Sequence, residues 1–163
     1  MVKLSIILSV LSFVFTSPVS LQKSTVVALN VNKQYNSSPN KENYTIIETV
    51  PIKKNNTTVI YLHHLYPKGF VLVAASDKVN PIVGYSFDSN FKNFDLPENF
   101  DFFINSQKNS IYNSLNSNYN RSIESESEWN VFINNDFSTS DYRNVSPLID
   151  AEFDQSGSWN NTL

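Results

Sequence analysis

The sequence predicts a small α+β domain in which an antiparallel meander sheet packs with an N-terminal and a C-terminal helix. Short β-rich runs separated by tight turn signals lie between residues 57 and 86, and such spacing is typical of a meander. Apolar residues recur at helical spacing on both sides of this region, over residues 20–35 and 96–116. With 163 residues, the chain has room for one domain plus tails.

The predicted strands differ in how they should be buried. Residues 57–66 alternate, so that successive side chains point to opposite faces of the sheet. After a Pro-Lys-Gly turn, residues 70–74 form a continuous apolar run, which favours a central strand covered on both faces. Residues 81–86 form another short strand. Residues 44–52 are rich in β-branched residues but alternate poorly, so the clear prediction is a meander of three strands.

Two helices are expected to flank the sheet. Ser20 is suited to cap the first, over residues 20–35, although its β-branched residues weaken the helical signal. Pro97 and Glu98 favour the start of the second, because proline fits the first turn and a carboxylate suits the positive end of the helix dipole. Its apolar face has members at helical spacing: Phe100, Phe103, Ile104, Ile111, Tyr112 and Leu115.

The N-terminus has the pattern of a secretory signal peptide over residues 1–20. A single lysine precedes an apolar run at residues 4–15, and small residues follow it. About 12 apolar residues are too few to span a bilayer, which needs roughly 20. We therefore expect a secreted, extracellular protein that has no membrane association after signal cleavage.

The C-terminal third is predicted to lie outside the folded domain of residues 21–117. Residues 118–145 are expected to be a linker, because the repeated Ser-Glu pattern at 122–128 is too polar to bury. Trp129 belongs to a small apolar island within it. Residues 146–163 form a separate C-terminal segment after the linker.

Composition excludes several classes of function. A formal net charge of −3 gives no basic surface for nucleic acid, and the absence of cysteine excludes disulfides, thiolate metal sites and a cysteine nucleophile. With 3 glycines there is no phosphate-binding loop. No cofactor or metal is predicted.

Few polar residues form a pattern suited to chemistry. His63 and His64 are adjacent on a strand and face opposite sides, so they cannot chelate one metal, and we interpret both as structural. Asp150, Glu152 and Asp154 share one strand face and are interpreted as a solvated edge. Sequons of the N-x-S/T type, which an Asn- and Ser-rich chain produces by chance, begin at Asn36, Asn43, Asn55, Asn56, Asn120, Asn144 and Asn160.

One block of sequence points to a family. Residues 69–86 read Gly-Phe-Val-Leu-Val-Ala-Ala-Ser-Asp-Lys-Val-Asn-Pro-Ile-Val-Gly-Tyr-Ser. This resembles the prosegments of streptopain-like cysteine peptidases and the related Spi inhibitors, which have a Gly-Phe-Val-Ile-Val strand, an acidic turn and then Pro-Ile-Leu-Gly-Tyr-Ser. Ala75-Ser76 departs from the family's Ser-Gly or Ser-Ala pair.

Weaker similarities follow in the family's order. Residues 18–20 lead into the first helix, and residues 96–100, Leu-Pro-Glu-Asn-Phe, open the second. Residues 147–161 are similar to the start of the mature peptidase, with Phe153 and Trp159 at positions where the family has Trp and Tyr. The resemblance therefore implies that residues 146–163 are the start of a truncated peptidase domain. The family's catalytic cysteine has no counterpart in this chain, so the chain is expected not to be an enzyme.

The resemblance implies a prosegment that covers the cleft of a streptopain-like cysteine peptidase and displaces its catalytic histidine, in cis or in trans. The loop of residues 87–95 would be the inhibitory segment. Its candidate residues are three aromatic anchors and two asparagines suited to contact the histidine: Phe87, Phe91, Phe94, Asn90 and Asn93. The alternative is that the loop aromatics pack on the chain's own core.

Three classes of function remain open at this point. The chain is a secreted inhibitor or prosegment, or it is the N-terminal fragment of a cysteine peptidase precursor, as the similarity at 147–161 suggests. The third class is a secreted binding module that shares the fold, because one fold hosts many functions.

Overall fold

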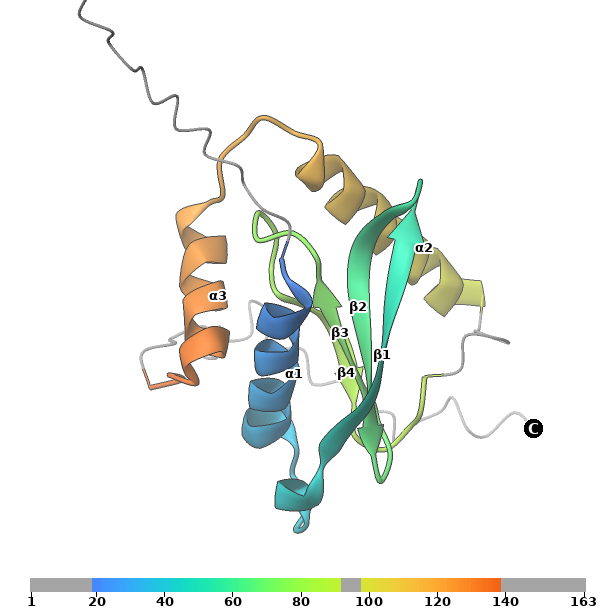
Figure 1. Cartoon of the computed structure of the whole chain (residues 1–163), viewed down its shortest axis with the longest axis vertical. Helices are drawn as coiled ribbons and strands as arrows, with labels where there is room; N and C mark the ends of the chain where they lie inside the picture. Colours follow the sequence, from blue (N-terminus) through green and yellow to red (C-terminus); the bar gives the residue numbers. More distant parts are fainter. Residues whose placement is uncertain (1–18, 92–97, 139–163) are drawn as a thin grey trace, which may run out of the picture.

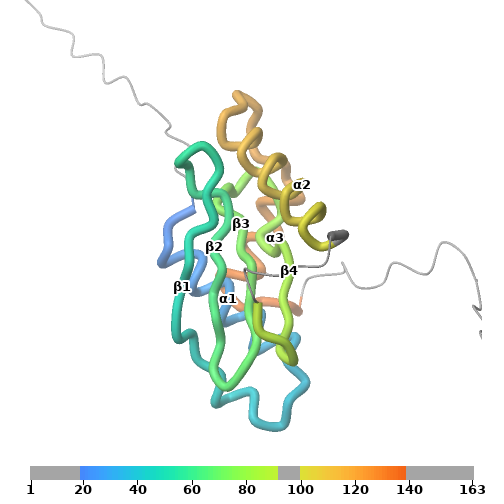
Figure 2. The backbone as a smooth tube through the Cα atoms, turned by 90° about the vertical axis from the view of Figure 1, so that its right-hand side faces the viewer, coloured from blue at the N-terminus to red at the C-terminus, as the bar shows by residue number. Residues whose placement is uncertain are grey.

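The computed structural model describes residues 19–91 and 98–138, and it shows a three-layer α+β fold (Figure 1). A four-stranded sheet in the order β1-β2-β3-β4 separates α1 and α3 on one face from α2 on the other (Figure 2). The predicted fold class is confirmed. The elements are α1 (Leu21–Tyr35), a short 3₁₀ turn (Lys41–Asn43), β1 (Thr45–Lys54), β2 (Thr57–Tyr66), β3 (Phe70–Ala74), β4 (Ile82–Ser86), α2 (Glu98–Leu115) and α3 (Ile123–Asn134).

The meander has one strand more than the three expected. Every neighbouring pair is antiparallel, and β1 pairs with β2 along its whole length. Asn55 and Asn56 make the tight connection between them with positive φ angles of 47° and 63°, a conformation that asparagine tolerates better than most residues. The poor alternation of β1 has a structural cause, because a bulge between Ile46 and Glu48 shifts the register.

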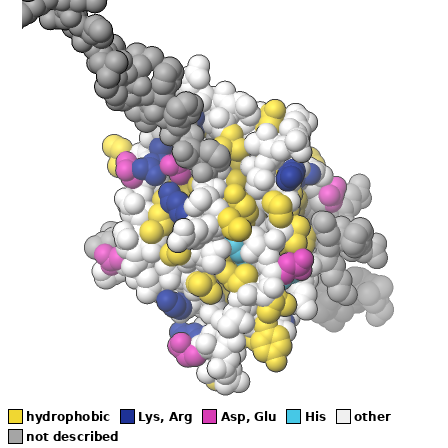
Figure 3. All heavy atoms as spheres, viewed as in Figure 1, with side chains coloured by type: hydrophobic (Ala, Val, Ile, Leu, Met, Phe, Trp, Pro, Cys, Tyr) yellow, Lys and Arg dark blue, Asp and Glu magenta, His cyan; other side chains and the backbone are white. Residues whose placement is uncertain are grey.

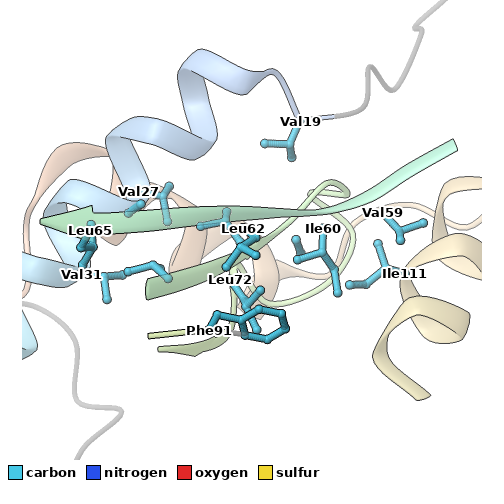
Figure 4. Close-up of a cluster of buried hydrophobic side chains, with 14 of the residues drawn as sticks. Val19, Val27, Val31, Val59, Ile60, Leu62, Leu65, Leu72, Phe91 and Ile111 are labelled. Atoms are coloured by element: carbon cyan, nitrogen blue, oxygen red, sulfur yellow. The ribbon is translucent and has the colours of Figure 1, made fainter. Parts of the chain in front are cut away.

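The core joins all three layers. In Figure 4, Ile60 of β2 lies next to Ile111 of α2, and Leu72 of β3 lies next to Phe91. Val27 of α1 is fully buried in the same cluster. The continuous apolar run of β3 is buried from Val71 onwards, which agrees with a strand covered on both faces.

α1 begins where the sequence predicts. Ser20 has an extended backbone, and its hydroxyl accepts a hydrogen bond from the Lys23 N–H at 3.1 Å. α2 begins at Glu98, and Pro97 lies outside the described residues. Among the described residues, no helix is long and apolar enough to cross a membrane.

The linker prediction is wrong for residues 123–134, which form α3. Ser122 caps the helix by accepting a hydrogen bond from the Ser125 N–H at 3.1 Å, and Asn135 ends it in the left-handed conformation. Trp129 is fully buried and belongs to the main core. The polar Ser-Glu residues did not exclude burial, because a helix needs only one apolar stripe and the small Ser125 fits on the buried side.

Gly69 is held in a conformation that other residues rarely adopt. Its φ is 111°, and a Cβ at this position would lie 2.5 Å from the Ser86 carbonyl oxygen. Gly69→Ala is therefore expected to lower the free energy of unfolding by about 2 kcal/mol in urea denaturation. Gly84→Ala is the matched control, because its Cβ would meet only Leu72 Cδ1 at 3.9 Å. A loss as large for Gly84→Ala would contradict the assignment of strain to Gly69.

Candidate functional site

The segment after β4 begins with a buried aromatic ring. Phe87 is 9% exposed, and its ring packs edge-on against Tyr44 at 6.3 Å and next to Tyr85 at 5.2 Å. The Tyr44 hydroxyl donates a hydrogen bond to the Phe87 carbonyl oxygen at 3.3 Å. Phe87 thus ties the start of the candidate inhibitory loop to the sheet.

Phe91 is a second point at which the loop packs on the domain. Its ring is 7% exposed and lies edge-on to Phe70 at 5.2 Å and 6.0 Å from Phe100 of α2. Of the two packing modes considered for the loop aromatics, the structure therefore places Phe87 and Phe91 on the chain's own core. Neither ring is available as a surface anchor.

Asn90 is exposed, but its side chain has a structural partner. The Gly69 N–H donates a hydrogen bond to Asn90 Oδ1 at 2.8 Å, which joins the loop to the turn between β2 and β3. Between the two buried rings the chain is exposed at residues 88–90, and the Ser86 hydroxyl accepts hydrogen bonds from the N–H groups of Asp88 and Ser89. Residues 87–91 therefore form a supported projection whose outer surface is polar.

The remaining two candidates, Asn93 and Phe94, lie outside the described residues. The structure thus brings Phe87, Asn90 and Phe91 together at one end of the sheet. The role of all five residues in inhibition stays a prediction.

A recess of about 430 Å³ lies beside this projection. Phe87 and Asp88 line one part of it, and Tyr44 and Lys68 line another. The rest comes from residues 35–39, which follow α1. Lys68 and Asp88 also form an exposed ion pair at 3.4 Å, which contributes little to stability in water.

Sequence reasoning missed the role of the acidic turn between β3 and β4, which is fixed by the C-terminal helices. The Lys78 ammonium group donates a hydrogen bond to the Ser117 carbonyl at 2.8 Å, and the Ser114 hydroxyl donates to the Ser76 hydroxyl, also at 2.8 Å. Asp77 pairs with Arg121 at 3.3 Å. The turn therefore has a structural role, because it joins the sheet to the C-terminal helices.

His63 is the centre of a buried polar chain. Thr49 Oγ1 lies 2.8 Å from His63 Nδ1, and Ser24 Oγ lies 3.1 Å from Nε2. The Ser24 hydroxyl donates to the Leu21 carbonyl at 2.8 Å, so the network is satisfied when Nε2–H donates to Ser24 and Nδ1 accepts from Thr49. This is the neutral form of histidine, and burial lowers the pKa of His63 to about 4.

The Ser24–His63 pair superficially has the geometry of a nucleophile and its base. Both side chains are fully buried, however, so no substrate carbonyl can reach the hydroxyl. Within the described residues no acidic side chain hydrogen-bonds to the His63 ring, and Thr49 is the partner of Nδ1. The pair is structural, as the sequence interpretation of His63 expected.

Charge gives the site no strong preference for an ionic partner. On the face shown in Figure 3, acidic and basic side chains are scattered among polar and apolar ones. Within the described part of the chain, no group of three or more metal-ligating side chains occurs.

These features define an α+β domain with a supported loop at one end of its sheet. A family model for Spi protease inhibitors matches residues 17–111, which is more than half of the chain. The chain belongs to the Spi protease inhibitor family, an inhibitor family and not a catalytic one. Neither the curated proteins nor the solved structures gave a match. The matched region spans α1, the sheet and most of α2, and α3 lies beyond it.

Proposed function

We propose that this chain is exported and that its domain binds and blocks a streptopain-like cysteine peptidase. The observation that carries the proposal is the family match, which includes the block at residues 69–86. In the structure this block forms β3, the acidic turn and β4, and it leads directly into the supported projection at residues 87–91. The signal-peptide pattern of residues 1–20 supports export.

The geometry suggests how such a domain would inhibit. Residues 87–91 form a rigid base for the candidate inhibitory loop, because Phe87, Phe91 and Asn90 are all held by the domain itself. A base of this kind lowers the entropy lost when a loop enters a cleft. With Phe87 and Phe91 buried, Asn93 and Phe94 become the candidates for direct contact with the peptidase.

The test is inhibition by the purified chain without residues 1–20. We expect a streptopain-like cysteine peptidase to lose activity as the chain is added, while an unrelated serine peptidase stays active. Full activity of the cysteine peptidase at micromolar excess of the folded chain would refute the proposal.

Two asparagine variants distinguish a residue that contacts the peptidase from one that stabilises the loop. Asn93→Ala is expected to weaken inhibition by roughly tenfold without changing stability, as for one lost interfacial hydrogen bond. Asn90→Ala removes the acceptor of the Gly69 N–H and is expected to lower the free energy of unfolding by about 1 kcal/mol. Inhibition titrations and urea unfolding of both variants check this. Unchanged inhibition by Asn93→Ala would remove that residue from the contact.

A second candidate is the N-terminal part of a cysteine peptidase precursor. The similarity of residues 147–161 to the start of a mature peptidase favours it, because an inhibitor acting in trans needs no such segment. Sequencing the DNA beyond the codon for Leu163 decides between the two. A following segment with a catalytic Cys and a later His supports the precursor, and their absence from all three frames supports the inhibitor.

A further inference from the structure

The candidate inhibitory loop is small compared with a stable protein–protein interface. It comprises residues 87–95, and in its described part the side chains of Phe87 and Phe91 are buried. Each partner in a stable complex contributes roughly 20–30 residues and about 800 Å² of surface. An inhibitor that blocks a peptidase must therefore contact it through neighbouring surface as well as through this loop.

The turn between β2 and β3 lies directly against the loop. In Figure 1 and Figure 2 this turn is beside the chain that leaves β4. The Lys68 ammonium group lies 3.4 Å from the Asp88 carboxylate, and the Gly69 N–H donates to Asn90. A Cβ on Gly69 would lie 3.1 Å from Phe87 Cα, which shows how closely the two backbones approach. The turn and residues 87–91 therefore form one continuous end of the sheet.

Tyr66 places an aromatic side chain on the surface at this turn. It is the last residue of β2 and is 59% exposed. Tyrosine is enriched among the residues that carry most of the binding energy of an interface, because its ring is large and apolar while its hydroxyl can still form a hydrogen bond. Tyr66 is thus suited to be the aromatic anchor that the buried Phe87 and Phe91 do not provide.

Ile47 on the neighbouring strand is exposed at the same level of the sheet. Thr45 pairs with Tyr66 and Glu48 pairs with His64, and the bulge between them leaves Ile47 out of the β1–β2 register. Ile47 is 65% exposed. Bulges are over-represented next to functional sites, where they direct a side chain away from the regular alternation of the strand. The bulge therefore adds a second large apolar side chain beside Tyr66.

The exposed apolar side chains of the sheet gather at this end. Three strand residues in the described part of the chain are large, apolar and exposed, namely Ile47, Tyr66 and Tyr85, and all three lie in the half of the sheet nearest the β2–β3 turn. At the opposite end, residues 53–57 read Lys-Lys-Asn-Asn-Thr. Single exposed apolar residues are common on protein surfaces, but a group at one end of a sheet is typical of a contact surface.

We propose that Tyr66 and Ile47 contact the peptidase and, with the exposed residues 88–90, form the described part of the inhibitory surface. The partner is the streptopain-like cysteine peptidase of the proposed function, on which this inference rests. The peptidase surface that meets Tyr66 and Ile47 is apolar and lies beside the cleft. The loop and the turn then bind as one unit, because the contacts of Gly69 and Lys68 join them.

Inhibition titrations with variants of the full chain test this surface. Tyr66→Ala is expected to weaken inhibition by roughly tenfold or more, and Ile47→Ala by roughly fivefold, as for anchors in an interface. Urea unfolding should show little change in stability for either variant, because both side chains are exposed. Tyr119→Ala is the matched control. Tyr119 is 53% exposed and lies near Lys78 at the opposite end of the sheet, so this variant should inhibit as strongly as the unmodified chain.

The outcomes distinguish this inference from the proposed function. If the unmodified chain leaves the peptidase fully active, the proposed function is wrong and the inference is wrong with it. If the unmodified chain inhibits and both Tyr66→Ala and Ile47→Ala inhibit equally well, this inference alone is wrong. Self-association that Tyr66→Ala abolishes, with inhibition unchanged, would show that a second copy of the chain occupies the surface instead.

Hydroxyl-radical footprinting provides a readout that does not require any variant to fold. In the unmodified full chain, oxidation of Tyr66, followed by mass spectrometry, should slow when saturating peptidase is added, because the contact shields the ring. Oxidation of Tyr119 should continue at the same rate. An unchanged rate at Tyr66 in a complex that is inhibited would contradict the contact.

Discussion

Replacing Trp129 with alanine is expected to lower the free energy of unfolding by about 3–5 kcal/mol. The indole is fully buried in the main core, and its Nε1–H donates a hydrogen bond to the Val79 carbonyl at 2.8 Å. The Lys23 ammonium group also lies 4.8 Å from the centre of the ring. The substitution therefore removes a large apolar side chain, a hydrogen bond and a cation–π contact at once.

The measurement is urea unfolding followed by far-ultraviolet circular dichroism, because the substitution removes a fluorophore. Trp129→Phe keeps most of the packing. It should lower the free energy of unfolding by about 1–2 kcal/mol, mainly because the hydrogen bond is lost. Ile123→Ala is the matched control in the same helix, since Ile123 is 82% exposed, and it should change stability by less than about 0.5 kcal/mol. A loss below about 1 kcal/mol for Trp129→Ala would mean that α3 is not part of the cooperative domain.

α3 belongs to the folded domain although it lies beyond the residues that match the family. The family match stops at residue 111, yet α3 contacts α1 through the Asn30 amide, which donates to the Phe132 carbonyl at 2.7 Å. The same helix fixes the acidic turn through Trp129. A stable inhibitor should therefore extend at least to Asn134, and a chain cut at the end of the match should lose much of its stability.

The contrast between α2 and α3 shows what the sequence could reveal about the fold. The apolar face of α2 is large and regular, so the pattern predicted the helix almost to its ends. In α3 the buried side is made by Trp129, Val131 and the small Ser125, among several glutamates and serines. Such a stripe is recognisable only once the complementary surface of α1 and the acidic turn is known.

The candidate site shows a similar limit. The opposite orientations of His63 and His64 followed from strand geometry alone, and the structure agrees for buried His63. For Phe87 and Phe91 no such period exists, because they lie in a loop. Their burial depends on Tyr44 and Phe70, which are distant in sequence, and only the tertiary structure brings them together.

Acidification is expected to destabilise the domain through His63. The pKa of this histidine is lowered by burial to about 4 in the folded chain, against an ordinary value of 6.5. As the pH falls below 6.5, the unfolded chain binds a proton before the folded chain does, which favours unfolding. The contribution of His63 to stability is complete above pH 6.5 and is lost progressively towards pH 4. A difference of this size corresponds to about 3 kcal/mol.

The Glu128 carboxyl acts in the opposite direction, because burial raises its pKa and protonation on acidification then stabilises the folded chain. The effect of His63 is therefore measured as a difference between variants. Urea unfolding at several pH values from 7 to 4.5 should show a steep loss of stability in the unmodified chain. His63→Gln keeps a neutral polar side chain in the cavity, and its stability should depend much less on pH over this range.

His64→Gln is the matched control on the other face of β2. It is only partly buried, and the pH profile of this variant should retain the steep loss. If His63→Gln and the unmodified chain lose stability in parallel as the pH falls, the buried network of Ser24, His63 and Thr49 is not the origin of the acid sensitivity. If they diverge, the buried network of Ser24, His63 and Thr49 is the origin of the acid sensitivity, and acid destabilises the sheet from which residues 87–91 project.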